Sequence, residues 1–309
     1  MSDGLDRSYL GAYAGQWFVV KLGGEVLLNA AGLDALAADI ATLVRDGVLL
    51  ALVHGGGPQA DALAARLGHT PHKVNGRRIT TDLDLEIAKM AYGGSINLEL
   101  LGALRRHGVR GVGVSGVDAN LLTVIRRPPR RVRDAVSGTE QVVDFGHVGD
   151  IVEADPNLLH VLGGARMVPV IASLAADTAG ALYNVNADSV ASALAGAVDA
   201  TKLIVLTNVT GVLADPHDPA TRWSVLDTAD CDRLIAQGVI TGGMLPKVQA
   251  CLDALGAGVC RTHILNGTLD HSLLLESFTY EGVGTMILRP SDKSAYLAGR
   301  SEPPPLRGA

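Results

Sequence analysis

The sequence has 309 residues, of which 48% are hydrophobic, and its formal net charge is −6 at pH 7. This length allows one large domain or two smaller ones. Acidic and basic residues are interspersed, which disfavours nucleic acid or an anionic membrane surface as the main partner. No apolar run approaches the roughly 20 residues that span a bilayer, and the first residues lack a secretory-signal pattern. Three cysteines without metal-ligand spacing favour a reduced compartment. We therefore expect a cytoplasmic protein.

Apolar runs alternate with segments of helical spacing along the chain. Strands are predicted at residues 17–22, 48–54, 109–115, 167–172, 202–206 and 262–265. Helices are predicted at residues 33–44, 83–106, 188–197 and 247–255. This alternation predicts an α/β fold with a central, mainly parallel sheet and helices on both faces. Ligands of such sheets bind at the carboxyl ends of the strands.

Two segments break the alternation. Residues 126–134 (RRPPRRVRD) are basic and contain two prolines, so we expect a surface hairpin or loop that faces water; a phosphate-binding role stays open. Residues 288–309 contain three consecutive prolines and few apolar side chains. We expect this tail to be disordered.

Glycine-rich turns follow the first two predicted strands. Lys21 ends the first strand and precedes Gly23 and Gly24, whose N–H groups could form an anion-binding nest. The second strand runs into His54-Gly-Gly-Gly-Pro, which places Gly56 and Gly57 at a helix N-terminus suited to phosphate. The alternatives are a strand-end turn with a surface lysine and a flexible connecting turn. We interpret His54 as a satisfied, partly buried histidine rather than a catalyst.

Three further motifs carry charged or amide side chains. In NGRR, Arg77 or Arg78 could bind a carboxylate through two hydrogen bonds. In NVNAD, Asn184 offers a donor, and Asp188 is either a helix cap or an anchor for lysines. Lys247 begins a helix, where a cation opposes the helix dipole unless an anion compensates it; the alternative is a surface lysine. No metal-ligand pattern is present, so we expect no metal held by protein ligands.

Two lysines, an aspartate and glycine-lined backbone are the groups that phosphoryl transfer needs. Cations and N–H groups spread the charge of the transferred group, and a carboxylate orients the cations. The sequence therefore favours a phosphotransferase.

The motifs KLGG, HGGGP, NGRR, SGVD, DFGHVGD, NVNAD and GGMLPK, in this order, resemble those of the amino-acid kinase family over about residues 9–287. They resemble most the members that use ATP to phosphorylate the γ-carboxylate of N-acetyl-L-glutamate, the second step of arginine biosynthesis. The resemblance implies an open three-layer αβα sandwich. Residues 17–178 would form an N-terminal lobe for the acyl-amino acid and for dimerisation, and residues 179–287 a C-terminal lobe for ATP.

The resemblance also implies roles for individual residues. Lys21 and Lys247 would stabilise the transferring phosphoryl group, and Asp188 would hold both lysines. The remaining binding roles fall to Gly56, Gly57, Arg78 and Asn184 for the acyl-amino acid, and to Gly23, Gly24, Asn208, Gly211 and Lys247 for the nucleotide. The acceptor carboxylate is already ionised at neutral pH, so no general base is needed, and Mg²⁺ would arrive with ATP. Asn208, where an aspartate is usual, and Glu25, where a small or apolar residue is usual, depart from the family pattern.

Regulation by L-arginine is a further implication. Within the N-terminal segment 1–16, residues 7–16 (RSYLGAYAGQ) resemble the helix that interlaces dimers of arginine-inhibited members into hexamers, with Tyr9 in the matching place; the alternative is a frayed end. Residues 271–287 resemble the C-terminal signature of the same class, which would place His271, Glu281 and Gly284 at an arginine site. We therefore expect a homo-oligomer, a dimer or a hexamer built as a trimer of dimers.

Two other functions stay open. One is a kinase for an amino acid linked to a carrier protein in lysine biosynthesis. The other is a catalytically silent arginine sensor, which would be expected to lack a lysine or the aspartate of the set Lys21, Asp188 and Lys247, although all three are present.

Overall fold

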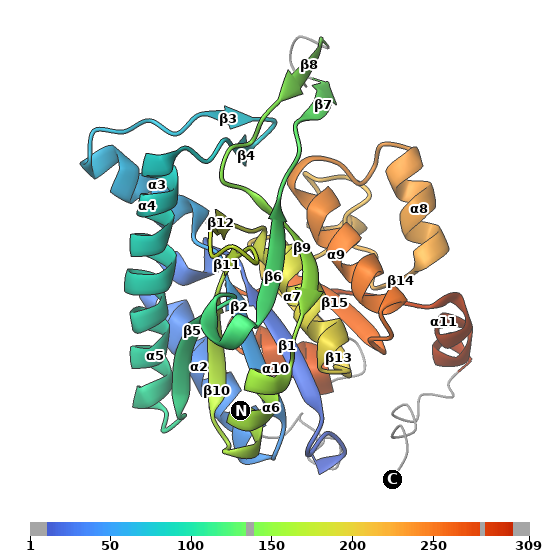
Figure 1. Ribbon diagram of the computed structural model, residues 1–309. Coiled ribbons are helices and arrows are strands. Elements are labelled where there is room, and N and C mark those ends of the chain that lie inside the picture. Colours follow the sequence, from blue (N-terminus) through green and yellow to red (C-terminus); the bar gives the residue numbers. More distant parts are fainter. Residues whose placement is uncertain (1–10, 134–138, 279–281, 299–309) are drawn as a thin grey trace.

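An eight-stranded sheet forms the middle layer of the computed structural model, which describes residues 11–133, 139–278 and 282–298 (Figure 1). The strand order is β14-β16-β15-β13-β1-β2-β10-β5, and all neighbours are parallel except β15 and β16. The strands are β1 (Trp17–Leu22), β2 (Leu49–His54), β5 (Gly111–Ser115), β10 (Val168–Ala172), β13 (Lys202–Thr207), β14 (Val225–Asp227), β15 (Arg261–Asn266) and β16 (Thr285–Leu288).

The central strand β1 divides the hydrophobic core into two halves. Its side chains alternate between the two faces of the sheet, so Phe18 and Val20 pack in one apolar cluster and Val19 in the other. All six residues of β1 are buried, as expected for a parallel strand covered on both faces.

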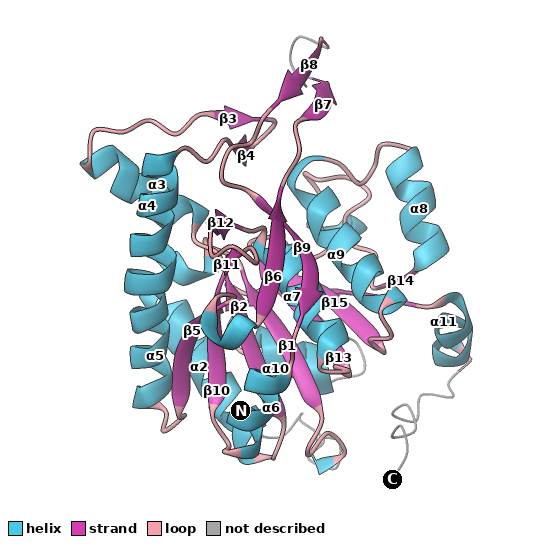
Figure 2. Cartoon of the chain, viewed as in Figure 1, coloured by secondary structure: helices cyan, strands magenta, loops and turns pink. Residues whose placement is uncertain are grey.

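Helices cover both faces of this sheet (Figure 2). The cluster around Phe18 contains apolar residues of α2, α5 and α10, and the cluster around Val19 contains those of α6, α7, α8 and α9. The helices are α2 (Ala30–Arg45), α3 (Gly57–Arg66), α4 (Asp82–Ala88), α5 (Asn97–Arg106), α6 (Asn157–Gly164), α7 (Ala187–Ala197), α8 (Thr228–Ala236), α9 (Leu245–Gly256), α10 (Ser272–Phe278) and α11 (Pro290–Leu297). The predicted αβα sandwich is therefore confirmed.

Smaller sheets accompany the central one, and the two that are hairpins lie at the top of Figure 1. One sheet has the order β12-β11-β6-β9, and two hairpins are formed by β3 with β4 and by β7 with β8. These strands are β3 (Lys73–Val74), β4 (Arg77–Arg78), β6 (Leu122–Arg126), β7 (Arg130–Arg133), β8 (Glu140–Val143), β9 (Gly149–Ala154), β11 (Leu174–Ala176) and β12 (Leu182–Asn184). The basic segment 126–134 thus contributes to a hairpin, one of the two forms expected for it.

The prediction of a disordered tail is wrong for its first part. Leu288 ends β16, and Pro290–Leu297 forms α11. Proline fits the first turn of a helix because the N–H that it lacks would have no partner there. Lys293 pairs with Asp227 and Asp230 at the start of α8, which fastens α11 to the domain. Residues 299–309 lie outside the described part.

Two other predictions need qualification. The helical stretch 83–106 includes a π-helical segment, Lys89–Ile96, between α4 and α5. The predicted N-terminal helix is only partly described: residues 1–10, which include Tyr9, lie outside the described part. Tyr13 is buried in its own chain and contacts Phe18 edge to face.

Within the described ranges, no helix is long and apolar enough to cross a membrane.

Candidate active site

A pocket of about 550 Å³ opens at the carboxyl ends of β1 and β13. It is lined by the glycines that follow β1, by the segment after β13 and by the start of α9. The lining includes Lys21, Gly23, Gly24, Glu25, Asn208, Gly211 and Lys247. All five residues predicted to bind a nucleotide therefore lie around one pocket.

The glycine turn after β1 packs directly against the start of α3. A Cβ atom on Gly24 would lie 2.7 Å from Cδ of Pro58 and 3.4 Å from the backbone N of Gly57. Gln59 fastens the same contact, because its Nε2 donates to the Gly24 carbonyl at 2.8 Å. Only glycine allows this approach of two loops, and the approach brings the KLGG and HGGGP motifs together.

A buried ion pair joins Lys21, which lines the pocket, to Asp188 on α7. Lys21 Nζ is 2.9 Å from Asp188 Oδ1, and both side chains are less than a tenth exposed. Asp188 is in the first turn of α7, but the N-cap is Asn186, whose side chain accepts from the backbone N–H groups of residues 188 and 189. The carboxylate of Asp188 is thus available to hold a lysine rather than to cap the helix.

Lys247 lies in the first turn of α9, within electrostatic range of this pair. Burial lowers the pKa of Lys247, and the nearby Lys21 charge acts in the same direction while the Asp188 carboxylate opposes it. Lys247 Nζ donates to the Gly243 carbonyl at 3.0 Å. In this geometry Asp188 holds Lys21 directly and affects Lys247 only at longer range.

A second pocket, of about 820 Å³, lies on the other side of the α3 and α9 N-termini. At the start of α3, Gly57 lines the second pocket and its neighbour Pro58 lines the first. At the start of α9, Pro246 lines the second pocket and its neighbour Lys247 lines the first. The two pockets therefore meet at two helix N-termini, which favour negative charge. The predicted acyl-amino-acid residues Gly56, Gly57, Arg78 and Asn184 all line the second pocket.

Gly56 is confined by the π-helical segment. A Cβ at this position would clash with Cδ1 of Ile96 and would lie 3.0 Å from the ring of Tyr92. π-Helical turns insert an extra residue and occur frequently at functional sites. Here the segment brings Tyr92 to the wall of the second pocket.

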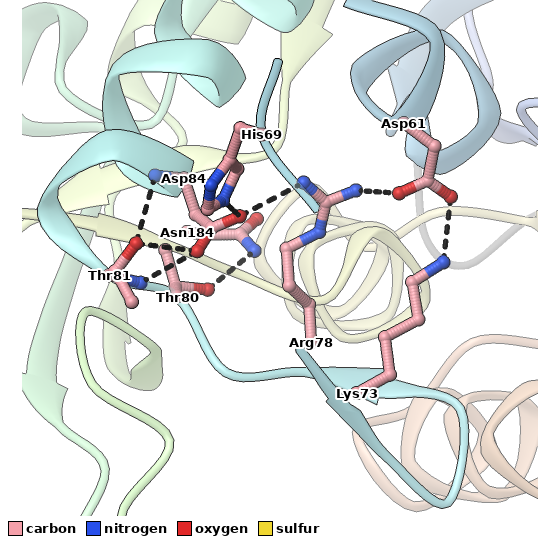
Figure 3. Close-up of polar contacts among 8 residues, drawn as sticks. All are labelled: Asp61, His69, Lys73, Arg78, Thr80, Thr81, Asp84 and Asn184. Atoms are coloured by element: carbon pink, nitrogen blue, oxygen red, sulfur yellow. Dashed lines mark hydrogen bonds and ion pairs between the residues drawn. The ribbon is translucent and has the colours of Figure 1, made fainter. Parts of the chain in front are cut away.

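Arg78 is held by an acidic network (Figure 3). Its guanidinium pairs with Asp61 on α3 and contacts Asp84 on α4 at 3.5 Å. Burial opposes ionisation of Asp84, but hydrogen bonds from Thr81 and His69 prevail and hold the pKa of that carboxyl below its usual range. The network fixes the position of Arg78, whereas the neighbouring Arg77 has an exposed side chain.

Asn184 ends β12 beside this network (Figure 3), and its Nδ2 lies 3.4 Å from the hydroxyl oxygen of Thr80.

His54 is structural, in agreement with the sequence interpretation. Its Nδ1 donates to the Gly55 carbonyl at 2.9 Å, and its Nε2 accepts from Asn97 at 3.3 Å. Burial lowers the pKa of His54 to about 4, which keeps the ring neutral.

The residues predicted for an arginine site are only partly described. His271 pairs through Nδ1 with the buried Asp39 at 2.7 Å. Gly284 donates its N–H to Glu276 at 2.8 Å, and its carbonyl accepts from Arg222. Glu281 lies outside the described part of the chain, so the arginine site stays a prediction.

The sequence reasoning missed a group of charges in the second pocket. Arg127 and Arg130 belong to the basic stretch expected to face water, yet both line this pocket, as does Asp150. The Arg127 side chain is only 13% exposed. Asp150, the acidic partner of Arg127, lies 23 residues away in the sequence, on β9, so no local spacing indicates the pairing.

Comparison with known proteins agrees with this architecture. The model of the amino acid kinase family matches residues 16–266. The chain belongs to the amino acid kinase family. The family and the fold class predicted from the sequence are thereby confirmed, together with the assignment of a kinase.

Several curated relatives carry the name acetylglutamate kinase. The protein from Symbiobacterium thermophilum is 43% identical over 281 residues, which cover 91% of this chain and 94% of that protein. The protein from Methanothermobacter thermautotrophicus is 38% identical over 279 residues, with 90% and 95% covered.

Solved structures share the fold. N-acetylglutamate synthase from Neisseria gonorrhoeae, complexed with coenzyme A and N-acetyl-glutamate, has a TM-score of 0.76 and 29% identity over 91% of this chain, which spans 61% of the synthase chain. Carbamate kinase from Giardia lamblia bound to AMP-PNP has a TM-score of 0.62 at 17% identity, with 90% and 99% covered, and shows the fold alone.

Proposed function

We propose that the protein transfers the γ-phosphoryl group of ATP to the γ-carboxylate of N-acetyl-L-glutamate, giving N-acetyl-L-glutamyl 5-phosphate and ADP. The observation that carries this proposal is the meeting of the two pockets at the N-termini of α3 and α9, with Lys21 and Lys247 lining the first pocket. The acetylglutamate kinases that are 38–43% identical over about nine-tenths of the chain support the choice of acceptor.

The chemistry requires charge stabilisation and alignment. The acceptor carboxylate has a pKa near 4 in water, so it is an oxyanion at neutral pH and needs no base. Lys21 and Lys247 stabilise the negative charge on the transferring group, and the N–H groups of the glycine turns add fixed donors. Asp188 holds Lys21 in place at the wall of the first pocket, so the cation needs little reorganisation when the reaction occurs.

The pocket residues also fit a nucleotide that carries Mg²⁺. Among the described residues, no group of three or more His, Cys, Asp or Glu side chains could hold a metal ion. The nearby carboxylates are Asp188, which is paired with Lys21, and Glu25, which lines the nucleotide pocket. A bound Mg²⁺ would neutralise phosphate charge, with most of its ligands supplied by the nucleotide and by water.

The test is ATP-dependent formation of a hydroxamate when hydroxylamine traps the acyl phosphate. N-acetyl-L-glutamate should support turnover, and Lys21→Ala should remove most of it in a folded protein. Carbamate and L-aspartate serve as alternative acceptors. Turnover with either of these and none with N-acetyl-L-glutamate would reject the proposal. Turnover only with an amino acid attached to a carrier protein would favour the lysine-biosynthesis alternative.

We also propose that L-arginine inhibits the enzyme and that the protein assembles through homodimers. The inhibition is supported by a second structure of the Neisseria gonorrhoeae synthase, complexed with coenzyme A and L-arginine. It has a TM-score of 0.75 at 25% identity, covering 98% of this chain and 70% of the synthase chain.

The assembly is supported by an apolar row on the helical stretch from α4 to α5. Leu83, Met90 and Leu98 are 45–67% exposed and follow one another at intervals of seven and eight residues.

Light scattering after gel filtration and turnover assays with arginine test these proposals. The expected results are a mass of at least two chains and a loss of turnover with arginine. A monomer at assay concentration would reject the assembly, and turnover indifferent to arginine would reject the inhibition; neither result affects the kinase assignment.

A further inference from the structure

A second guanidinium centre lies in the acyl-amino-acid pocket, away from Arg78. Arg127 donates through Nε and Nη2 to the same oxygen of Asp150, at 2.9 and 2.6 Å. Arg130 donates through Nη2 to the other oxygen at 2.8 Å. The Asp150 carboxylate is thus bridged by two arginines, and the three side chains together carry one positive charge.

The packing around Arg127 holds it in this arrangement. Its guanidinium carbon lies 5.9 Å from the centre of the Phe145 ring, and its backbone N donates to the Val148 carbonyl at 2.8 Å. Phe145 and Val148 line the same pocket. Among the described residues Nη1 of Arg127 has no hydrogen-bond partner, which leaves its two N–H groups for oxygens of the substrate.

The pocket offers few carboxylates to a ligand with a free amino group. Among the described residues two carboxylates line it, Asp150 and Asp253. Asp150 is bound by the two arginines. Asp253 is exposed on α9 and accepts from Gln249 at 2.8 Å. Five cationic side chains also line the pocket: Lys73, Arg77, Arg78, Arg127 and Arg130. An α-ammonium group would therefore meet an excess of positive charge, which the solvent-screened Asp253 offsets only weakly, and this costs free energy in a partly desolvated site.

We propose that Arg127 and Arg130 determine specificity by neutralising Asp150, so that the pocket rejects free α-amino acids and accepts their N-acylated forms. The inference rests on the proposed function, which supplies the acylated substrate, and assigns the discrimination to named residues. Acylation removes the positive charge of the amino group and adds a carbonyl oxygen that Nη1 of Arg127 can bind. Specificity then depends on a repulsive element as well as an attractive one.

The experiment compares N-acetyl-L-glutamate with L-glutamate, both by isothermal titration calorimetry and by hydroxamate formation. Arg127→Gln frees one oxygen of Asp150 to pair with an ammonium group. We expect the preference for N-acetyl-L-glutamate over L-glutamate to fall at least tenfold. Arg127→Lys retains the charge and should retain most of the preference.

Two further variants make the test specific. In Arg127→Gln with Asp150→Asn, the freed carboxylate is absent, so L-glutamate should again be rejected. Arg126→Gln is the matched control, because Arg126 is exposed, pairs with Asp144 and does not line the pocket; its preference should equal that of the wild type. Circular dichroism and thermal unfolding identify variants that fail to fold, and Arg130→Gln provides a second way to release Asp150.

Each outcome bears on at least one of the two proposals. A folded Arg127→Gln with an unchanged preference overturns the inference, as does a lost preference that persists in the double variant. A wild-type protein that binds N-acetyl-L-glutamate without turning it over rejects the proposed function, while the binding preferences still decide the inference. A wild-type protein that binds L-glutamate as tightly as N-acetyl-L-glutamate overturns the inference, and one that binds neither overturns both.

Discussion

Gly24→Ala tests whether the close packing of the two glycine turns controls catalysis. The new Cβ would lie 2.7 Å from Cδ of Pro58, whereas carbon atoms prefer separations of about 3.5–4.0 Å. The proline ring cannot rotate away, so the turn after β1 and the start of α3 must separate by about 1 Å. A displacement of that size at a reacting site can lower turnover ~100-fold, and overpacking of this kind costs about 1–3 kcal/mol of unfolding free energy.

The assay measures kcat for hydroxamate formation together with urea unfolding. Gly102→Ala is the control, since Gly102 is exposed in α5 and a Cβ there meets nothing within 4 Å. The control should keep wild-type turnover and gain roughly 0.5–1 kcal/mol, because alanine loses less conformational entropy in a helix. A folded Gly24→Ala variant with kcat within about threefold of the wild type, a difference of less than ~1 kcal/mol in barrier, would refute the argument.

Three other perturbations follow from the structure. Arg78→Gln should raise KM for N-acetyl-L-glutamate by roughly 10–100-fold, the value of a charged hydrogen bond, and an equal effect of Arg77→Gln would show that the wrong arginine has been assigned. Asp188→Asn should lower kcat by about 10²–10³-fold and the unfolding free energy by roughly 3 kcal/mol, because buried Lys21 loses its counter-ion; unchanged urea unfolding would contradict this. Burial lowers the pKa of Lys202 to about 7, against 10.5 for an ordinary lysine. Between about pH 7 and 10.5 the unfolded chain therefore binds more protons than the folded one, and the unfolding free energy should fall as the pH drops through this range. Lys202→Met should remove this pH dependence in thermal unfolding.

Continuous apolar runs made the central sheet predictable. The strand at Trp17–Leu22 has the bounds predicted from the sequence, because a parallel strand buried on both faces needs a nearly continuous apolar run, interrupted here only by Lys21. Lys21 and the glycines were identifiable for a related reason. A charge or a glycine at the end of such a run has little use in a core, so its presence indicates a ligand.

Pairings between distant segments could not be read from the sequence. Asp61 and Asp84 hold Arg78 from two different helices, and Asp150 holds Arg127 from another strand. Each of these carboxylates resembles an ordinary surface residue until the fold brings it beside its partner. The basic stretch at 126–134 was assigned to solvent because charged runs usually face water, and the position of Arg127 in the pocket depends on where β6 ends.

Local patterns also misled in two places. The proline-rich composition of the last residues concealed α11, whose first turn contains Pro290 and whose position depends on a tertiary ion pair of Lys293. The helical spacing of residues 83–106 gave no indication of the π-helical segment. That segment depends on tertiary packing, since Tyr92 and Ile96 pack against Gly56 in the turn that follows β2.

The most direct test of the account is ³¹P nuclear magnetic resonance of the protein mixed with ATP, Mg²⁺ and N-acetyl-L-glutamate. The account predicts that an acyl-phosphate resonance grows as the γ-phosphate of ATP disappears, and that the folded Lys21→Ala variant leaves ATP unchanged. Unaltered ATP with the folded wild-type protein, or conversion of ATP to ADP and free phosphate at the same rate without the acceptor, would contradict it.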